Sequence, residues 1–296
     1  MHRRQLLTGI GAAAGLTVLG TACGSGDGVP AVDAEQSLFV QAASLEFLSG
    51  PDRWLAFGVR DLQNTPIDDA DVQVYLRTIA TAPDQTAEVV AGPLAASFAP
   101  ATETGQGIYY LQTTIEEPGL YDVVATVGDD HGVASIQVVD PSNSRVAVPG
   151  EAAISARTAT TEDDLGVFAV CTQDPPCGMH EMSLDEALDT GRPVALMFAT
   201  PEFCQTAVCG PSVSTLDAVR GDGDWGDTIF VHSEIFAEAP VGAEAPTTPL
   251  VPAVEAWGLP SEPWFFTIGG DGVIAGRLDG PMPEPILRSM LEGLTA

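Results

Sequence analysis

Cys204 and Cys209 are the residues of this chain best suited to thiol chemistry. They follow a short apolar run, Val194–Ala199, which lies between two prolines and shows no polar alternation. Such a run is typical of a strand that is buried on both faces. The segment after it is predicted to be helical to about residue 220. Because the N-terminal end of a helix favours negative charge, a cysteine there loses its proton easily, and Cys204 is the predicted nucleophile.

Cys209 is predicted to be the resolving thiol. Five residues along a regular α-helix correspond to a rotation of about 140°, so a Cys204–Cys209 disulfide cannot form within such a helix. The segment between the two cysteines is therefore predicted to be a loop, or to unwind on oxidation. Gly210-Pro211 favours a helix that begins later, because proline is tolerated in the first helical turn. A disulfide with a purely structural role is the alternative interpretation.

The elements around this pair alternate between strands and helices, which predicts an α/β fold. A short helix is expected to end at Gly191, before the first strand. The remaining elements are expected in this order: strand 194–199, helix 204–220, strand 228–235, helix 251–257, strand 264–268, strand 273–278 and helix 284–294.

Residues 166–296 resemble the thioredoxin superfamily. The resemblance rests on Phe198–Cys204, where that family carries a strand, a loop and its first redox cysteine, and on Trp257–Ile268 followed by Gly270-Asp-Gly. It implies a thioredoxin-like α/β domain in which the peptide bond before Pro263 is cis and lies beside the redox cysteine. The family signature is Cys-x-x-Cys, whereas this chain has four residues between its cysteines.

Three further titratable side chains are expected near the cysteines. Glu262 precedes Pro263 in place of the small or β-branched residue usual in the family, and its carboxylate is expected to raise the pKa of the neighbouring thiol. His232 and Glu234 alternate along a predicted strand and therefore point to the same face. A histidine within reach of Cys204 can act as its base or join it as a metal ligand. The alternative is that His232 and Glu234 are a polar pair at a strand end with no chemical role.

Cys171 and Cys177 are predicted to form a structural disulfide that closes a stiff loop containing two prolines. A second interpretation uses the soft ligand atoms of Cys177, Met179, His180 and Met182, which suit copper or zinc. No spacing of the usual Cys₂His₂ type is present, so no metal site is assigned from the sequence.

Three classes of function are consistent with these residues. The first is a thiol–disulfide oxidoreductase that needs no cofactor and acts on the thiols or disulfides of exported proteins. The second is a copper-delivering protein, because Cys204, Cys209 and His232 resemble the ligand set of the Sco-like group. The third is a thiol peroxidase, because Thr200–Cys209 is similar to the peroxidatic loop of some peroxiredoxins.

The N-terminus resembles a bacterial lipoprotein signal. A basic start, His2-Arg3-Arg4, precedes an apolar core, Leu6–Leu19, and a small-residue segment that ends at Cys23. This pattern predicts a signal peptide over residues 1–22 and lipidation of Cys23, followed by a flexible tether over 23–35. The protein is therefore expected to be exported and anchored by lipid to the outer face of the bacterial cytoplasmic membrane. The paired arginines also resemble a twin-arginine export signal.

Residues 36–140 are predicted to form an all-β domain, and residues 141–165 a linker. Short apolar or alternating runs are separated by turn residues, at a spacing typical of an antiparallel sandwich. The domain resembles the immunoglobulin-like domains of bacterial envelope proteins. The runs are 45–48, 54–59, 72–76, 108–112, 121–127 and 133–139.

The charge of the chain excludes one class of partner. The formal net charge is −30, with 41 acidic residues against 11 basic ones, all of them arginine. Such a surface repels nucleic acid and anionic lipid headgroups. A nucleic-acid-binding function is therefore not expected, and contact with the membrane is expected only through the lipid at Cys23.

Overall fold

The structure is a computed structural model that describes residues 35–82, 84–100, 107–204, 208–240 and 248–295. The chain divides into two units, Met1–Ala34 and Glu35–Ala296, and the fold described below is that of the second. The predicted signal peptide and Cys23 lie outside the described residues. In the described part of the chain, no helix is long and apolar enough to span a bilayer.

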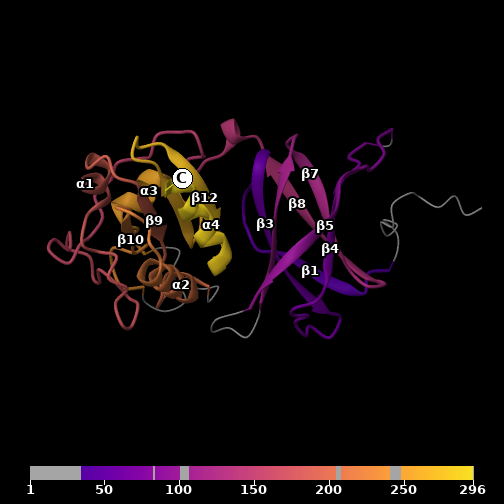
Figure 1. Cartoon of the computed structure of the whole chain (residues 1–296), viewed down its shortest axis with the longest axis horizontal. Coiled ribbons are helices and arrows are strands. Elements are labelled where there is room, and N and C mark those ends of the chain that lie inside the picture. The colour runs from indigo at the N-terminus through magenta and orange to yellow at the C-terminus, as the bar shows by residue number, and fades with distance from the viewer. Residues whose placement is uncertain (1–34, 83, 101–106, 205–207, 241–247, 296) are drawn as a thin grey trace, which may run out of the picture. The chain divides into compact units, whose positions relative to one another are not determined.

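The first half of the described chain forms an eight-stranded sheet (Figure 1). Its strands are β1 (Leu38–Ala42), β2 (Phe47–Leu48), β3 (Gly50–Asp61), β4 (Val72–Thr78), β5 (Val89–Ala99), β6 (Ile108–Ile115), β7 (Gly119–Val127) and β8 (Asp130–Val139). They lie in the order β1-β3-β6-β5-β4-β7-β8-β2. All neighbours are antiparallel except β2 and β8, which are parallel. Alternate apolar side chains of these strands gather in one buried cluster, as period-two alternation requires.

The second half contains a four-stranded mixed sheet with helices around it (Figure 1). The strands are β9 (Val194–Phe198), β10 (Ile229–Ser233), β11 (Trp264–Ile268) and β12 (Ile274–Asp279), and the helices are α1 (Leu184–Asp189), α2 (Cys209–Asp222), α3 (Pro252–Trp257) and α4 (Glu284–Thr295). The order is β10-β9-β11-β12, with β10 parallel to β9 and β11 antiparallel to both of its neighbours. A short 3₁₀ helix, Pro141–Asn143, follows the first sheet.

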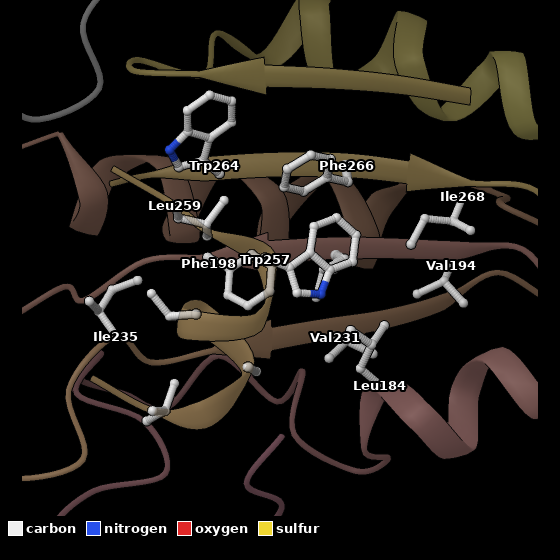
Figure 2. Packing of buried hydrophobic residues seen from close by; sticks show 14 of the residues in the cluster. Leu184, Val194, Phe198, Val231, Ile235, Trp257, Leu259, Trp264, Phe266 and Ile268 are labelled. Atoms are coloured by element: carbon white, nitrogen blue, oxygen red, sulfur yellow. The ribbon is translucent and has the colours of Figure 1, made fainter. Parts of the chain in front are cut away.

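β9 is buried on both of its faces. Leu196 and Phe198 pack in a cluster with residues of α1 and α3, among them Trp257 (Figure 2). Ala195 and Met197 point the other way and pack with residues of α2 and α4. The strand has no face in solvent, which explains its continuous apolar run and confirms the prediction made from that run.

The predicted fold class, an immunoglobulin-like sandwich followed by a thioredoxin-like α/β domain, is wrong. The described chain is predominantly β, and its helices are few and short, with α1 and α3 of 6 residues each. The eight strands of the first half form one continuous sheet, where two separate packed sheets were expected.

β5 explains why the first half was misread. This strand pairs with β4 along one edge and with β6 along the other, so it joins the strands into one sheet. Its sequence, VVAGPLAASFA, is rich in alanine and interrupted by Gly92-Pro93, which weakens the strand signal. The strand runs recognised in the sequence did not include it, and they gave no indication of how the other strands are joined.

Several individual elements lie where they were predicted. β11 spans the predicted residues 264–268, and α4 begins at Glu284 as expected. The Glu262–Pro263 peptide bond is cis, which confirms that prediction. The helix expected from about residue 204 begins at Cys209, in agreement with the later start that Gly210-Pro211 favours.

Candidate functional site

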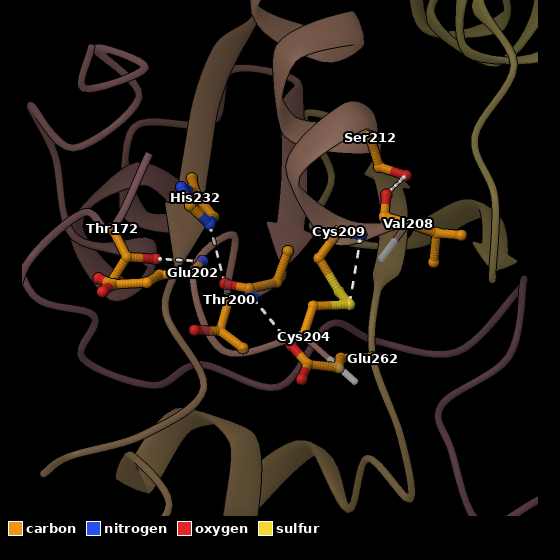
Figure 3. Close-up of a disulfide and its surroundings, with 10 residues drawn as sticks. Thr172, Thr200, Glu202, Cys204, Val208, Cys209, Ser212, His232 and Glu262 are labelled. Carbon is orange, nitrogen blue, oxygen red and sulfur yellow. Dashed lines mark hydrogen bonds between the residues drawn. A yellow bond between two sulfur atoms is a disulfide. The ribbon is translucent and has the colours of Figure 1, made fainter. Parts of the chain in front are cut away.

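Cys204 and Cys209 form a disulfide at the start of α2 (Figure 3). Their Cα atoms are 5.9 Å apart, and Cys209 is the first residue of the helix whereas Cys204 precedes it. The pair is therefore not held within a regular helix, as the spacing requires. Cys204 is partly exposed and Cys209 is fully buried. This asymmetry gives an incoming reactant access to the first sulfur and shields the second.

The N-terminus of α2 acts on the Cys204 sulfur. The backbone N–H of Cys209 donates a hydrogen bond to Cys204 Sγ at 3.4 Å. The N-cap residue, Val208, provides no side-chain cap to this 14-residue helix. An N–H and a helix dipole directed at a sulfur atom stabilise its thiolate. The predicted activation of Cys204 thus has a geometric basis, although the residue that opens the helix is Cys209.

Glu262 lies beside the two sulfurs, as expected from its place before Pro263. A carboxylate oxygen and both sulfur atoms lie within 4.8 Å of one another. The carboxylate accepts a hydrogen bond from the backbone N–H of Thr200 at 2.8 Å (Figure 3). Burial raises the pKa of Glu262 to about 7, although the Thr200 hydrogen bond opposes the shift. The carboxyl group can therefore both accept and release a proton near neutral pH.

A cleft of about 610 Å³ within the unit Glu35–Ala296 reaches this region. Val208, Ser212 and Glu262 are among the residues that line it. Clefts of this size accommodate a small ligand or a short peptide segment. The cleft gives a reactant a route toward the N-terminus of α2.

Cys171, Cys177, His180 and His232 form a second cluster, with one ligand atom from each residue within 4.8 Å of the others. The two sulfurs are 3.7 Å apart, and both thiols are free. The predicted Cys171–Cys177 disulfide is therefore wrong for this structure, in which Cys177 Sγ also contacts His180 Nε2 and His232 Nδ1. Hydrogen bonding to Cys177 lowers the pKa of Cys171, and the same contact together with burial raises the pKa of Cys177.

His232 does not join the Cys204–Cys209 pair. It lies on β10 with its side chain in the second cluster, and its Nε2 is 3.0 Å from the carbonyl oxygen of Ala199 (Figure 3). Glu234 follows it and accepts hydrogen bonds from the backbone N–H and hydroxyl of Thr172, at 2.6 and 2.9 Å. The ligand set expected for a Sco-like protein is therefore not assembled.

The alternative soft-ligand set is not assembled either. Met179 packs in the hydrophobic cluster that contains α2, and Met182 packs against the opposite cluster, which contains α3. Cys177 and His180 do converge, as that interpretation supposed, but their partners are Cys171 and His232. Sequence reasoning missed this combination because His232 is 52 residues from His180 and was assigned to Cys204.

Comparisons with protein families and with curated proteins find no match to this chain. Among solved structures, the Escherichia coli adhesin FdeC matches 43% of this chain and 38% of its own, with 16% identity and a TM-score of 0.23. The β-glucosidase from Listeria innocua matches 34% of this chain and 16% of its own, with 18% identity and a TM-score of 0.20. The chain thus spans well under half the length of either protein. Matches with such low TM-scores carry no argument about its function.

The resemblance to the thioredoxin superfamily and to immunoglobulin-like domains is accordingly corrected. No family model matches the chain, and its described part is predominantly β. The motifs that suggested the family are short, and a cysteine after a strand with a later proline does not define one. What the cysteine pair can do chemically therefore depends on its own geometry.

Proposed function

We propose that this chain is an exported thiol–disulfide oxidoreductase whose reactive pair is Cys204 and Cys209. The observation that carries the proposal is the asymmetric pair at the N-terminus of α2. The sulfur of the partly exposed Cys204 accepts a hydrogen bond from the backbone N–H of Cys209, and Cys209 itself is buried. A stabilised, accessible thiolate with a second thiol in bonding range is what disulfide exchange requires.

The reaction begins from the dithiol form. The Cys204 thiolate attacks one sulfur of a substrate disulfide, the substrate S–S bond breaks, and the departing substrate thiolate takes up a proton. The resulting mixed disulfide is resolved when the Cys209 thiolate attacks Cys204 Sγ, which releases the second substrate thiolate and forms the Cys204–Cys209 disulfide. Two electrons pass from the enzyme to the substrate, and the reverse sequence oxidises a substrate dithiol.

Glu262 suits the proton transfers of the resolving step. Cys209 is fully buried, so its thiol has no direct path to bulk water. The Glu262 carboxyl oxygen lies within 4.8 Å of both sulfurs and can take the proton from Cys209 as that thiol becomes a nucleophile. A carboxyl whose pKa is about 7 is suited to this exchange near neutral pH.

The proposed location follows from the N-terminal sequence. Residues 1–22 have the charge and hydropathy pattern of an export signal, and Cys23 ends a small-residue segment of the lipoprotein kind. Lipid attachment at Cys23 would hold the enzyme at the outer face of the cytoplasmic membrane. The exported side of a membrane is oxidising and contains proteins with thiols and disulfides, the proposed substrates.

The test is the reduction potential of the Cys204–Cys209 pair, together with catalysed reduction of insulin disulfides by the dithiol form. A reversible potential between about −270 and −120 mV, the range of exchange enzymes, is expected. A potential below about −300 mV indicates a structural disulfide and would contradict the proposal. Peroxide consumption without insulin reduction, or copper binding lost in Cys204→Ser, would also contradict it in favour of a peroxidase or a copper protein.

The raised pKa of Glu262 predicts a pH-dependent stability of the oxidised protein. The pKa is about 7 in the folded state against 4.5 ordinarily, so folding favours the protonated carboxyl. This contribution is fully present below pH 4.5 and is lost as the pH rises through 7. Glu262→Gln should remove it. As the pH rises from 4.5 to 8, the free energy of unfolding of the variant should increase by about 2 kcal/mol relative to that of the wild type. This value is smaller than the full pKa shift implies, because Glu262 is partly exposed.

Denaturant titrations at several pH values measure this difference. Asp279→Asn is the matched control, because burial also raises the pKa of Asp279, to about 6. The change in stability that this variant removes should therefore occur at a lower pH than the change removed by Glu262→Gln. Parallel stability curves for the wild type and Glu262→Gln across the whole range would show that Glu262 has an ordinary pKa and would remove its proposed role in proton transfer.

A further inference from the structure

The four side chains of the second cluster come from two parts of the chain. Cys171, Cys177 and His180 lie in a segment without helix or strand, and His232 lies on β10. Exposure is 2% for Cys177, 3% for His180 and 0% for His232, and Cys171 is partly exposed. Two thiols and two imidazoles therefore meet in a nearly closed site, away from the disulfide of the proposed function.

Four of the six distances between the ligand atoms match the edges of a metal-centred tetrahedron, and all six are within 4.8 Å. Cys177 Sγ lies 3.7 Å from Cys171 Sγ, 3.4 Å from His180 Nε2 and 3.3 Å from His232 Nδ1, and the two imidazole nitrogens are 3.2 Å apart. A tetrahedral zinc ion with ordinary bond lengths requires edges of about 3.8 Å between sulfurs, about 3.6 Å between sulfur and nitrogen, and about 3.3 Å between nitrogens. Each measured edge agrees with its counterpart to within about 0.3 Å.

The outer contacts of His232 orient it as a ligand. Its Nε2 lies 3.0 Å from the carbonyl oxygen of Ala199, an acceptor only, so Nε2 carries the hydrogen. Nδ1 is then left with a lone pair that faces the cluster. A histidine that donates its second ring N–H to a backbone carbonyl is the usual arrangement at protein metal sites.

The charges of the cluster also favour a divalent ion. A single buried thiolate is costly without a positive partner. The guanidinium of Arg220 lies nearby, but its hydrogen bond goes to the backbone carbonyl oxygen of Cys177, at 3.2 Å. Two thiolates, two neutral imidazoles and one divalent cation have no net charge. A zinc ion would thus neutralise both thiolates and take a ligand atom from each of the four residues at once.

We propose that Cys171, Cys177, His180 and His232 bind one zinc ion in a closed structural site. Four protein ligands leave no open position for a reactant, which distinguishes a structural from a catalytic zinc site. The ion would hold the irregular segment 171–180 against β10. It would also keep the two thiols reduced in an oxidising compartment, where free sulfurs 3.7 Å apart would otherwise form a disulfide.

The experiment measures zinc in the purified full-length chain after reduction, incubation with zinc sulfate alone and removal of excess metal. One zinc per chain is expected for the wild type and for the control Cys204→Ser, whose sulfur lies outside the cluster. Cys171→Ser and His180→Ala should each lower the zinc affinity at least about 100-fold. Cobalt(II) in place of zinc should give the visible absorption of a tetrahedral site with thiolate ligands, and Cys171→Ser should weaken it.

Several outcomes would overturn the proposal. The first is a content of less than a tenth of a zinc ion per chain in the reduced wild type. The second is an unchanged zinc content in the double variant Cys171→Ser, His180→Ala. The third is a wild-type protein that retains copper(I) but not zinc. A Cys171–Cys177 disulfide found by peptide mass analysis in protein that still binds zinc would do the same. Cys171 is partly exposed, so Cys171→Ser is the variant least expected to unfold, and circular dichroism of this variant checks that the fold is retained.

Discussion

Cys209→Ser is expected to stop turnover and to leave Cys204 joined to its substrate. With the resolving thiol gone, the Cys204 thiolate still attacks a disulfide, but nothing within the protein displaces the second half of the substrate. With oxidised glutathione as the probe, mass spectrometry should find one glutathionyl group per chain, at Cys204. Insulin reduction should fall at least about 10³-fold, because the resolving step then depends on a thiol from solution.

Cys204→Ser is the matched control for this experiment. It also removes the disulfide, so any loss of stability from that source is shared by the two variants. It lacks the attacking sulfur, however, and should form no adduct, because Cys209 is fully buried. Equal adduct formation in the two variants would contradict the assignment of Cys204 as the attacking residue. An adduct on Cys209 in the Cys204→Ser variant would reverse the two roles.

The elements around the cysteine pair were predictable because their signals are local. The apolar run Val194–Ala199 is buried on both faces, and every one of its residues in β9 has no exposed surface. Pro263 could be predicted as cis, and the start of α2 could be predicted to lie after Cys204 from Gly210-Pro211. Each of these features depends on a few adjacent residues and on backbone chemistry that acts over one turn.

The global arrangement was not predictable from the same signals. β5 joins the strands of the first half into a single sheet, yet its alanine-rich sequence with Gly92-Pro93 has low strand propensity. Pairing between strands depends on contacts far apart in the chain, which periodicity does not encode. The family-level prediction failed for a related reason, because it extended two short motifs to the whole second half of the chain.

The second cluster shows the same limit at the level of a site. The sequence placed Cys177 and His180 together, because they are three residues apart in a stiff loop. The sequence did not indicate that β10 brings His232 to that loop, since the contact between Cys177 and His232 joins residues 55 positions apart. His232 was instead assigned to the cysteine turn that its strand was expected to approach. Loop residues that converge on a strand are found by structure, and local spacing gives little warning of them.

Replacing Trp257 by alanine is expected to destabilise the second half of the chain strongly. The side chain is 1% exposed, and its ring packs against Phe198 and Phe266, with centroids 5.5 and 4.6 Å away (Figure 2). Its indole N–H donates to the carbonyl oxygen of Ile154 at 3.0 Å. Truncation of a buried tryptophan costs about 3–5 kcal/mol through lost burial and the cavity left behind, which corresponds to a fall in Tm of about 10 °C.

Two further variants separate the contributions to this effect. Trp257→Phe keeps an aromatic ring but loses the hydrogen bond to Ile154, and it should cost about 1–2 kcal/mol. Phe39→Ala removes an aromatic side chain that is 54% exposed, and it should change the free energy of unfolding by less than about 0.5 kcal/mol. Calorimetry of the oxidised proteins measures all three. If Trp257→Ala and Trp257→Phe differed by less than about 1 kcal/mol, the ring could not be part of a close-packed core behind β9, since a vacated site of this size cannot collapse without cost.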